Sequence, residues 1–77
     1  MSMTAEDWTE RFAAKLGVAP PTEEERDKLL ELAGVAAHAS ERAAAPISCW
    51  LAARAGVAPA DARSAASQLA KEMEAEG

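Results

Sequence analysis

The residues best suited to chemistry lie close together in one segment, HASERAAAPISCW, residues 38–50. His38 and Arg42 stand four positions apart, so they share a helix face if the helix continues through Arg42. Such a pair could bind a small anion or a carboxylate, with the arginine as a two-pronged donor and the histidine as a second donor or a proton carrier. The alternative is that both side chains cap the last carbonyls of a helix and complement its dipole.

The same segment contains the only cysteine of the chain, Cys49, next to Ser48. Both follow Pro46 at an expected helix start, where the helix dipole could lower the pKa of a thiol. A nucleophilic role would require His38 to fold back against them, and the alternative is two small residues packed within a helix. With one histidine, one cysteine, no metal-ligand spacing and no glycine-rich phosphate loop, we expect no enzyme, no cofactor and no metal site.

Helical periodicity interrupted by glycine and proline predicts the elements that position these residues. A threonine opens each of the first two helices, and Thr22 with Glu25 forms the pattern of a capping box. Gly17 and Gly56 stand where helices commonly end. Pro46 and Pro59 suit the first turn of a helix, because the missing N–H is harmless there. The expected helices span residues 4–16, 22–40, 46–55 and 59–73, with residues 41–45 as a connection.

The apolar stripes of these helices predict one thin core, because most of the hydrophobic residues are alanines. We expect Ile47, Trp50 and Leu51 to face inward on the third helix, and Phe12→Ala to cost about 3–5 kcal/mol of stability. Trp8 and Trp50 are either core residues or anchors for a partner, since tryptophan is favoured at binding hot spots. The core is expected to be centred on Trp8, Phe12, Leu16, Leu29, Leu32, Ile47, Leu51 and Leu69.

One short sequence occurs twice. Residues 13–20 read AAKLGVAP and residues 52–59 read AARAGVAP, identical at six of eight positions. This is either a duplicated helical hairpin or two independent uses of a common way to stop one helix and start another. Both alternatives predict an all-α fold of four helices in two helical hairpins, arranged as a small bundle or an orthogonal pair.

Length and charge restrict the partners. The 77 residues make a single domain, 1–77, with ends expected to fray at residues 1–3 and 74–77. The net charge of −5 argues against nucleic acid and against anionic membranes as partners.

The first seven residues carry acids where a signal peptide has basic residues, and a lone cysteine excludes an intrachain disulfide, so we expect a cytoplasmic protein. A chain this short is marginally stable, which favours a protein partner or self-association.

The pattern around His38 resembles a small actinobacterial helical domain family of unknown function. Its members have a W-x₃-[LF]-x₃-LG motif near the start and an AH-x₃-R-x₂-AP-[LIV] motif followed by an aromatic residue and a leucine. Two positions depart from that pattern, since Trp50 replaces the usual phenylalanine and Ala53 the usual glycine. The matching residues are Trp8, Phe12, Leu16-Gly17, Ala37-His38, Arg42, Ala45-Pro46-Ile47, Trp50 and Leu51.

Members of that family occur alone or fused to molybdopterin-guanine dinucleotide biosynthesis protein A, a guanylyltransferase of molybdenum-cofactor maturation. The resemblance therefore implies an accessory role near that pathway. We expect a non-enzymatic interaction module whose partner is such a guanylyltransferase or a second copy of the chain, with His38, Arg42, Pro46 and Trp50 at the binding surface. The alternative function is a binder of a small anion, nucleotide or pterin, or a weak enzyme, that uses His38 and Arg42.

Overall fold

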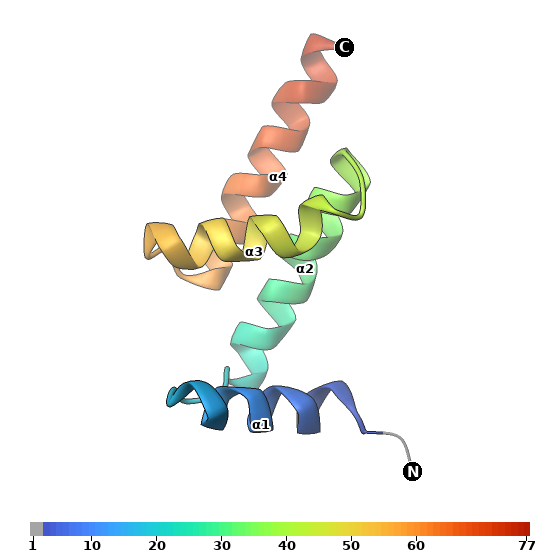
Figure 1. The fold of residues 1–77 in the computed structure, drawn as a ribbon. Coiled ribbons are helices and arrows are strands. Elements are labelled where there is room, and N and C mark those ends of the chain that lie inside the picture. The colour runs from blue at the N-terminus through green and yellow to red at the C-terminus, as the bar shows by residue number, and fades with distance from the viewer. Residues whose placement is uncertain (1–2) are drawn as a thin grey trace.

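The computed structural model describes residues 3–77, which form four α-helices (Figure 1). Helix α2 is central, because α3 and α4 both pack against it, while α1 lies across its N-terminal end (Figure 1). The predicted fold class, a small all-α bundle of four helices, is confirmed. Within residues 3–77, no helix combines the length and the apolar character needed to cross a membrane. The helices are α1 (Ala5–Leu16), α2 (Glu23–Ala39), α3 (Ala44–Ala55) and α4 (Pro59–Glu76).

The predicted caps set the ends of the first two helices. The Asp7 amide donates to Thr4 Oγ1 at 3.0 Å and closes the start of α1. At the start of α2 the Glu25 amide donates to Thr22 Oγ1 at 3.1 Å, and the Thr22 amide donates to Glu25 Oε1 at 2.8 Å. These bonds satisfy backbone donors that have no partner within the helix, so the capping box is confirmed.

The two Gly-Val turns have the same geometry. Gly17 and Gly56 have φ angles of 77° and 71°, a left-handed conformation that glycine adopts without a Cβ clash. After each glycine a valine amide, from Val18 or Val57, donates to a helix carbonyl five residues earlier at 3.0 and 3.1 Å. A duplicated hairpin and two independent uses of one turn both predict this shared geometry.

The chain leaves the two turns differently. Helix α4 begins at Pro59, whereas α2 begins at Glu23, three residues beyond the equivalent Pro20. Pro21 explains the difference, because a residue that precedes proline is disfavoured in the helical region. Pro20 therefore cannot start a helix, while Pro59, which is followed by Ala60, can. The connection between α1 and α2 is consequently longer than the one between α3 and α4.

The expected start of the third helix was wrong by two residues. Helix α3 begins at Ala44, after a turn in which the Ala44 amide donates to the Glu41 carbonyl at 2.9 Å. The connection thus spans residues 40–43 and not 41–45. Pro46 is the third residue of α3, still within the first turn, where an amide donor is not needed. Helix α4 continues to Glu76, and the fraying expected at residues 74–77 stays a prediction. The fraying expected at residues 1–3 falls largely on Met1 and Ser2, outside the described residues.

The predicted core was largely wrong. Within residues 3–77 the buried hydrophobic residues are Ala13, Leu32 and Ala62, and Leu29 is half-buried. The reason is that the helices meet α2 through small side chains, which leaves the large ones on the opposite faces. Because Phe12 is exposed, the expectation that Phe12→Ala removes core packing was also wrong. The expected core residues that are more than half exposed are Trp8, Phe12, Leu16, Ile47, Leu51 and Leu69.

We therefore expect Leu32, and not Phe12, to dominate stability. Leu32 is 3% exposed, and Leu30 on the same helix is 65% exposed. Leu32→Ala should lower the free energy of unfolding by about 2–5 kcal/mol, because it removes the one large buried side chain of the central helix. Leu30→Ala is the matched control, and we expect a change within about 0.5 kcal/mol. Urea unfolding followed by circular dichroism measures both, and equal effects would contradict this view of the core.

Candidate functional site

His38 and Arg42 do not share a helix. Helix α2 ends at Ala39, and Ser40 leaves it with φ −140° and ψ −95°. Arg42 therefore lies in the loop that follows, and the shared face expected from four-residue spacing does not form. The Ser40 hydroxyl and amide both donate to the Ala36 carbonyl, at 2.8 and 3.1 Å, so Ser40 itself caps this carbonyl. Both candidate side chains are exposed, and within residues 3–77 no hydrogen bond links them.

Pro46 and Trp50 lie on one exposed face of α3. They are four residues apart and share this face with Ile47 and Leu51, each more than half exposed. The Arg54 guanidinium lies 5.0 Å from the centroid of the Trp50 ring and stacks on it at the surface. The side chains of Ile47, Trp50 and Leu51 are called the α3 surface below. The expectation that these three residues face inward was wrong.

The opposite face of α3 contacts α2 through small side chains. Ser48, Cys49 and Ala52 are half-buried, and Cys49 Sγ lies 4.0 Å from the Leu29 carbonyl oxygen. Burial raises the pKa of the Cys49 thiol above its usual value, the reverse of the effect expected from a helix start. Cys49 is thus a packing residue that stays protonated near neutral pH, which does not suit a nucleophile.

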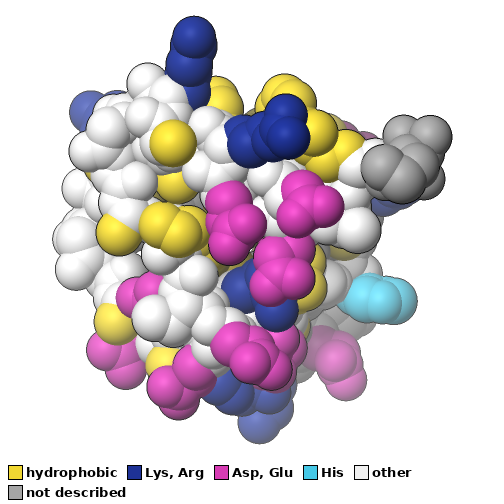
Figure 2. Space-filling view, turned by 90° about the horizontal axis from the view of Figure 1, so that it is seen from below, with side chains coloured by type: hydrophobic (Ala, Val, Ile, Leu, Met, Phe, Trp, Pro, Cys, Tyr) yellow, Lys and Arg dark blue, Asp and Glu magenta, His cyan; other side chains and the backbone are white. Residues whose placement is uncertain are grey.

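A second apolar surface, not anticipated as such, lies on α1. Trp8, Phe12 and Leu16 follow one another at four-residue spacing, and all are more than half exposed. The Trp8 and Phe12 rings stack with centroids 6.0 Å apart and an interplanar angle of 18°. These three side chains are called the α1 surface. The view toward the α1 end of the molecule shows hydrophobic side chains exposed among acidic and basic ones (Figure 2). The periodicity that predicted a core stripe in fact identified this surface.

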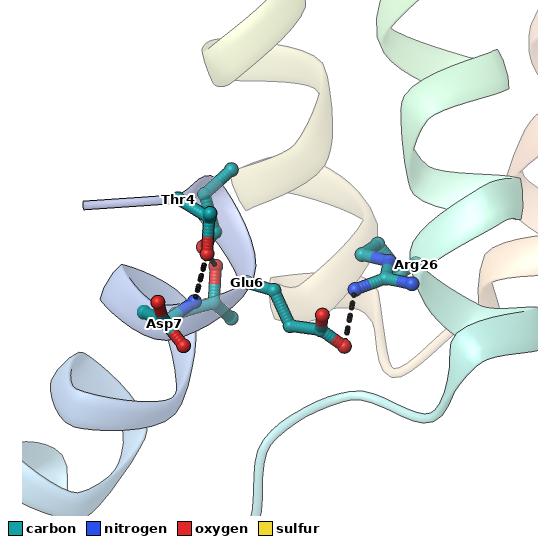
Figure 3. A network of polar contacts seen from close by, with 6 residues as sticks. Thr4, Glu6, Asp7 and Arg26 are labelled. Atoms are coloured by element: carbon teal, nitrogen blue, oxygen red, sulfur yellow. Dashed lines mark hydrogen bonds and ion pairs between the residues drawn. The ribbon is translucent and has the colours of Figure 1, made fainter. Parts of the chain in front are cut away.

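An ion pair links the start of helix α1 to α2. Arg26 Nη1 of α2 lies 3.2 Å from Glu6 Oε2 of α1, beside the Thr4 cap (Figure 3). Both side chains are partly exposed to solvent, so the ion pair adds about 0–1 kcal/mol at most. Ala13 is the buried residue of α1. The α1 surface is therefore held in place by a small contact and is not itself packed.

A hollow of about 710 Å³ lies between α2 and α4 beside His38. Its walls include Arg63 and Ser67 of α4, and Arg42 is not among the residues that line it. The Arg63 Nε lies 3.0 Å from Glu31 Oε1, and Lys28 Nζ lies 3.6 Å from the same oxygen, so Glu31 offsets these cations. A second carboxylate, Glu74, also lines the hollow. The mixture of charges gives an anion no net attraction.

Within residues 3–77, no group of three or more histidine, cysteine, aspartate or glutamate side chains is placed to hold a metal ion. The four predicted site residues thus lie in three different places. Pro46 and Trp50 lie on α3, His38 lines the hollow, and Arg42 lies in the loop between them. The large apolar side chains of α1 and α3 are exposed and could recognise another molecule.

The raised thiol pKa gives a direct test of how Cys49 is packed. At any pH near neutrality the folded chain should have a smaller thiolate fraction than the unfolded chain, because burial disfavours the charged form. The rate of alkylation by iodoacetamide should therefore reach half its maximum at a higher pH in the folded protein than in urea. Cys49→Ser supplies the background rate. Faster alkylation of the folded chain at pH 7 would indicate an activated thiol and contradict the packing role.

Comparison with known proteins gives the family of the chain and no function. Neither a curated protein nor a solved structure matches it. The family match covers residues 1–77, the whole chain. The chain therefore belongs to the family described as a domain of unknown function, DUF6457.

Proposed function

We propose that this domain is a non-enzymatic protein-interaction module that binds through the α1 and α3 surfaces. The observation that carries the proposal is that small side chains lie at the helix contacts and large apolar side chains lie at the surface. Alanine and other small residues face α2, while Trp8, Phe12 and Trp50 point to solvent. Large exposed apolar patches on small domains mark sites of association.

The composition of the two surfaces also supports binding to a protein. Each is a helix face with large side chains at three- and four-residue spacing, the arrangement by which amphipathic helices enter apolar grooves. Each contains one tryptophan, a residue enriched among those that dominate binding energy. Arg54 stacked on Trp50 adds a polar edge to the α3 surface. The net charge of −5 favours a protein over nucleic acid as the partner.

We further propose a molybdenum-cofactor guanylyltransferase as the pathway partner, with the cytoplasm as the compartment. This part of the proposal is supported by the sequence resemblance to domains that are fused to such an enzyme. A domain that is fused in some proteins and separate in others commonly acts on the same partner in both forms. The module would then position or stabilise the enzyme and supply no catalytic group of its own.

Binding of a purified molybdenum-cofactor guanylyltransferase, measured by isothermal titration calorimetry, tests the proposed function. Phe12→Ser and Leu51→Ser should each weaken binding at least about 10-fold, as loss of a large interface side chain does. Leu69→Ser is the matched control, because Leu69 of α4 is 55% exposed and Leu51 is 52% exposed. Helix content by circular dichroism confirms that each variant is folded. Equal affinity for all three variants would contradict binding through these surfaces.

A second candidate function is ligand binding in the hollow between α2 and α4. The observation that favours it is the position of His38, with Arg63 and Ser67 on the facing helix. Glu31 and Glu74 oppose an anionic ligand there, so we rank this function second.

A thermal-shift screen with guanine nucleotides, pterins and inorganic phosphate tests that candidate. If the hollow is a binding site, one of these compounds should raise the melting temperature by mass action, and His38→Ala or Arg63→Ala should abolish the shift. Arg42→Ala is the control, because Arg42 does not line the hollow. We expect no shift. A shift that depends on His38 would favour ligand binding over the interaction module.

A further inference from the structure

The core of the isolated chain is small. Within residues 3–77 only Ala13, Leu32 and Ala62 are buried, and only one of these is a large residue. A single core in a domain below about 70–80 residues rarely contributes more than about 3–5 kcal/mol, and many such domains add a disulfide, a metal or association with another chain. The single Cys49 cannot form an intrachain disulfide. Association with another chain is the direct way to bury the apolar surface that remains.

The solvent-exposed area of the chain gives the area that a partner would have to cover. The chain exposes 6138 Å² to solvent. A compact monomer of its mass, 8.0 kDa, exposes about 4,500 Å² by the scaling of folded proteins. The excess is therefore about 1,600 Å² for each chain. A standard interface takes about 800 Å² from each partner, and obligate homodimers bury about 2,000–5,000 Å² in total. The excess of two chains falls within the range of an obligate homodimer.

We propose that a second copy of this chain covers the α1 and α3 surfaces when no other protein is bound. The inference rests on the proposed interaction role and names the occupant of those same surfaces. A second copy is always present at the same concentration as the chain itself. A fold with so few buried residues needs a partner that is always present. In a two-fold dimer the same patches serve both subunits, so each chain presents and covers six large apolar side chains.

The contacts of α1 explain why this helix belongs to the interface. Its ion pair to the rest of the chain, Glu6 to Arg26, is partly exposed and therefore weak. Trp8 and Phe12 stack on each other with one side of the pair open to water. On the α3 surface Arg54 stacks on Trp50, which is still 57% exposed. Both surfaces thus have large side chains that gain contacts only from another chain.

Two measurements on the full chain test the proposal. Light scattering coupled to size exclusion at micromolar concentration should give twice the 8.0 kDa mass of one chain. The melting temperature should rise with protein concentration, because dimer dissociation is coupled to unfolding. This second readout needs no substitution, so it stands even if a surface variant fails to fold. A mass of one chain with a melting temperature independent of concentration would overturn the proposal.

The two tryptophans report on the two surfaces separately. Trp50→Phe leaves Trp8 as the only indole on the α1 surface, and Trp8→Phe leaves Trp50 on the α3 surface. On dilution from micromolar concentration the emission of both variants should shift to longer wavelength, since each indole becomes exposed when the dimer dissociates. A shift in one variant alone, or in neither, would overturn an interface made by both surfaces.

Matched substitutions separate this inference from the proposed function. Phe12→Ser and Leu51→Ser should lower the dimer mass toward one chain at concentrations where Leu69→Ser remains dimeric. If the wild-type chain is monomeric and these two variants still lose guanylyltransferase binding, the dimer is wrong and the interaction module stands. If the chain is monomeric and all variants bind the enzyme equally, both proposals fall.

Discussion

The packing of α3 and α4 against α2 depends on the small side chains that these two helices contribute. Helix α2 is approached by α3 through Ser48, Cys49 and Ala52, and the buried residue of α4 is Ala62. Small side chains let helix axes come close, and close axes leave no room for tryptophan or phenylalanine between them. The placement of the large residues follows from this constraint, since a helix that meets α2 with its alanine face must turn its bulky face outward. The surfaces proposed for binding are thus a consequence of how the fold is packed.

The features that could be predicted from the sequence are those decided within a few residues. The Thr22–Glu25 capping box and the ends of helices at Gly17 and Gly56 depend on local backbone bonds, and all were found as expected. The start of α3 was misplaced because an alanine run has no side-chain cap to mark it. The side that each helix turns inward depends on what lies across from it. On α3 the alanine stripe and the Ile47–Trp50–Leu51 stripe are both apolar, so periodicity alone cannot choose between them.

The candidate site also depends partly on neighbouring residues in the sequence and partly on contacts between helices. The four-residue spacing puts His38 and Arg42 on one face only if the helix continues past Arg42. Ser40 ends the helix before it reaches Arg42. Arg63, which lines the same hollow as His38, lies on another helix and has no sequence signal linking it to the histidine. Trp50 was singled out as part of a set with His38, whereas the structure places it on one face with Ile47 and Leu51. The sequence combines many alanines with a few large apolar side chains. Helices that pack through alanines leave no room for the large side chains between them, and this signal could have identified the two surfaces.

The proline at position 21 makes the two halves of this chain structurally unequal. The residue after the repeated Gly-Val-Ala-Pro segment is proline in the first copy and alanine in the second. Helix α4 therefore follows its turn directly, whereas a spacer stiffened by two prolines precedes α2. The side chain at one position thus decides how many residues separate one helix from the next along the chain.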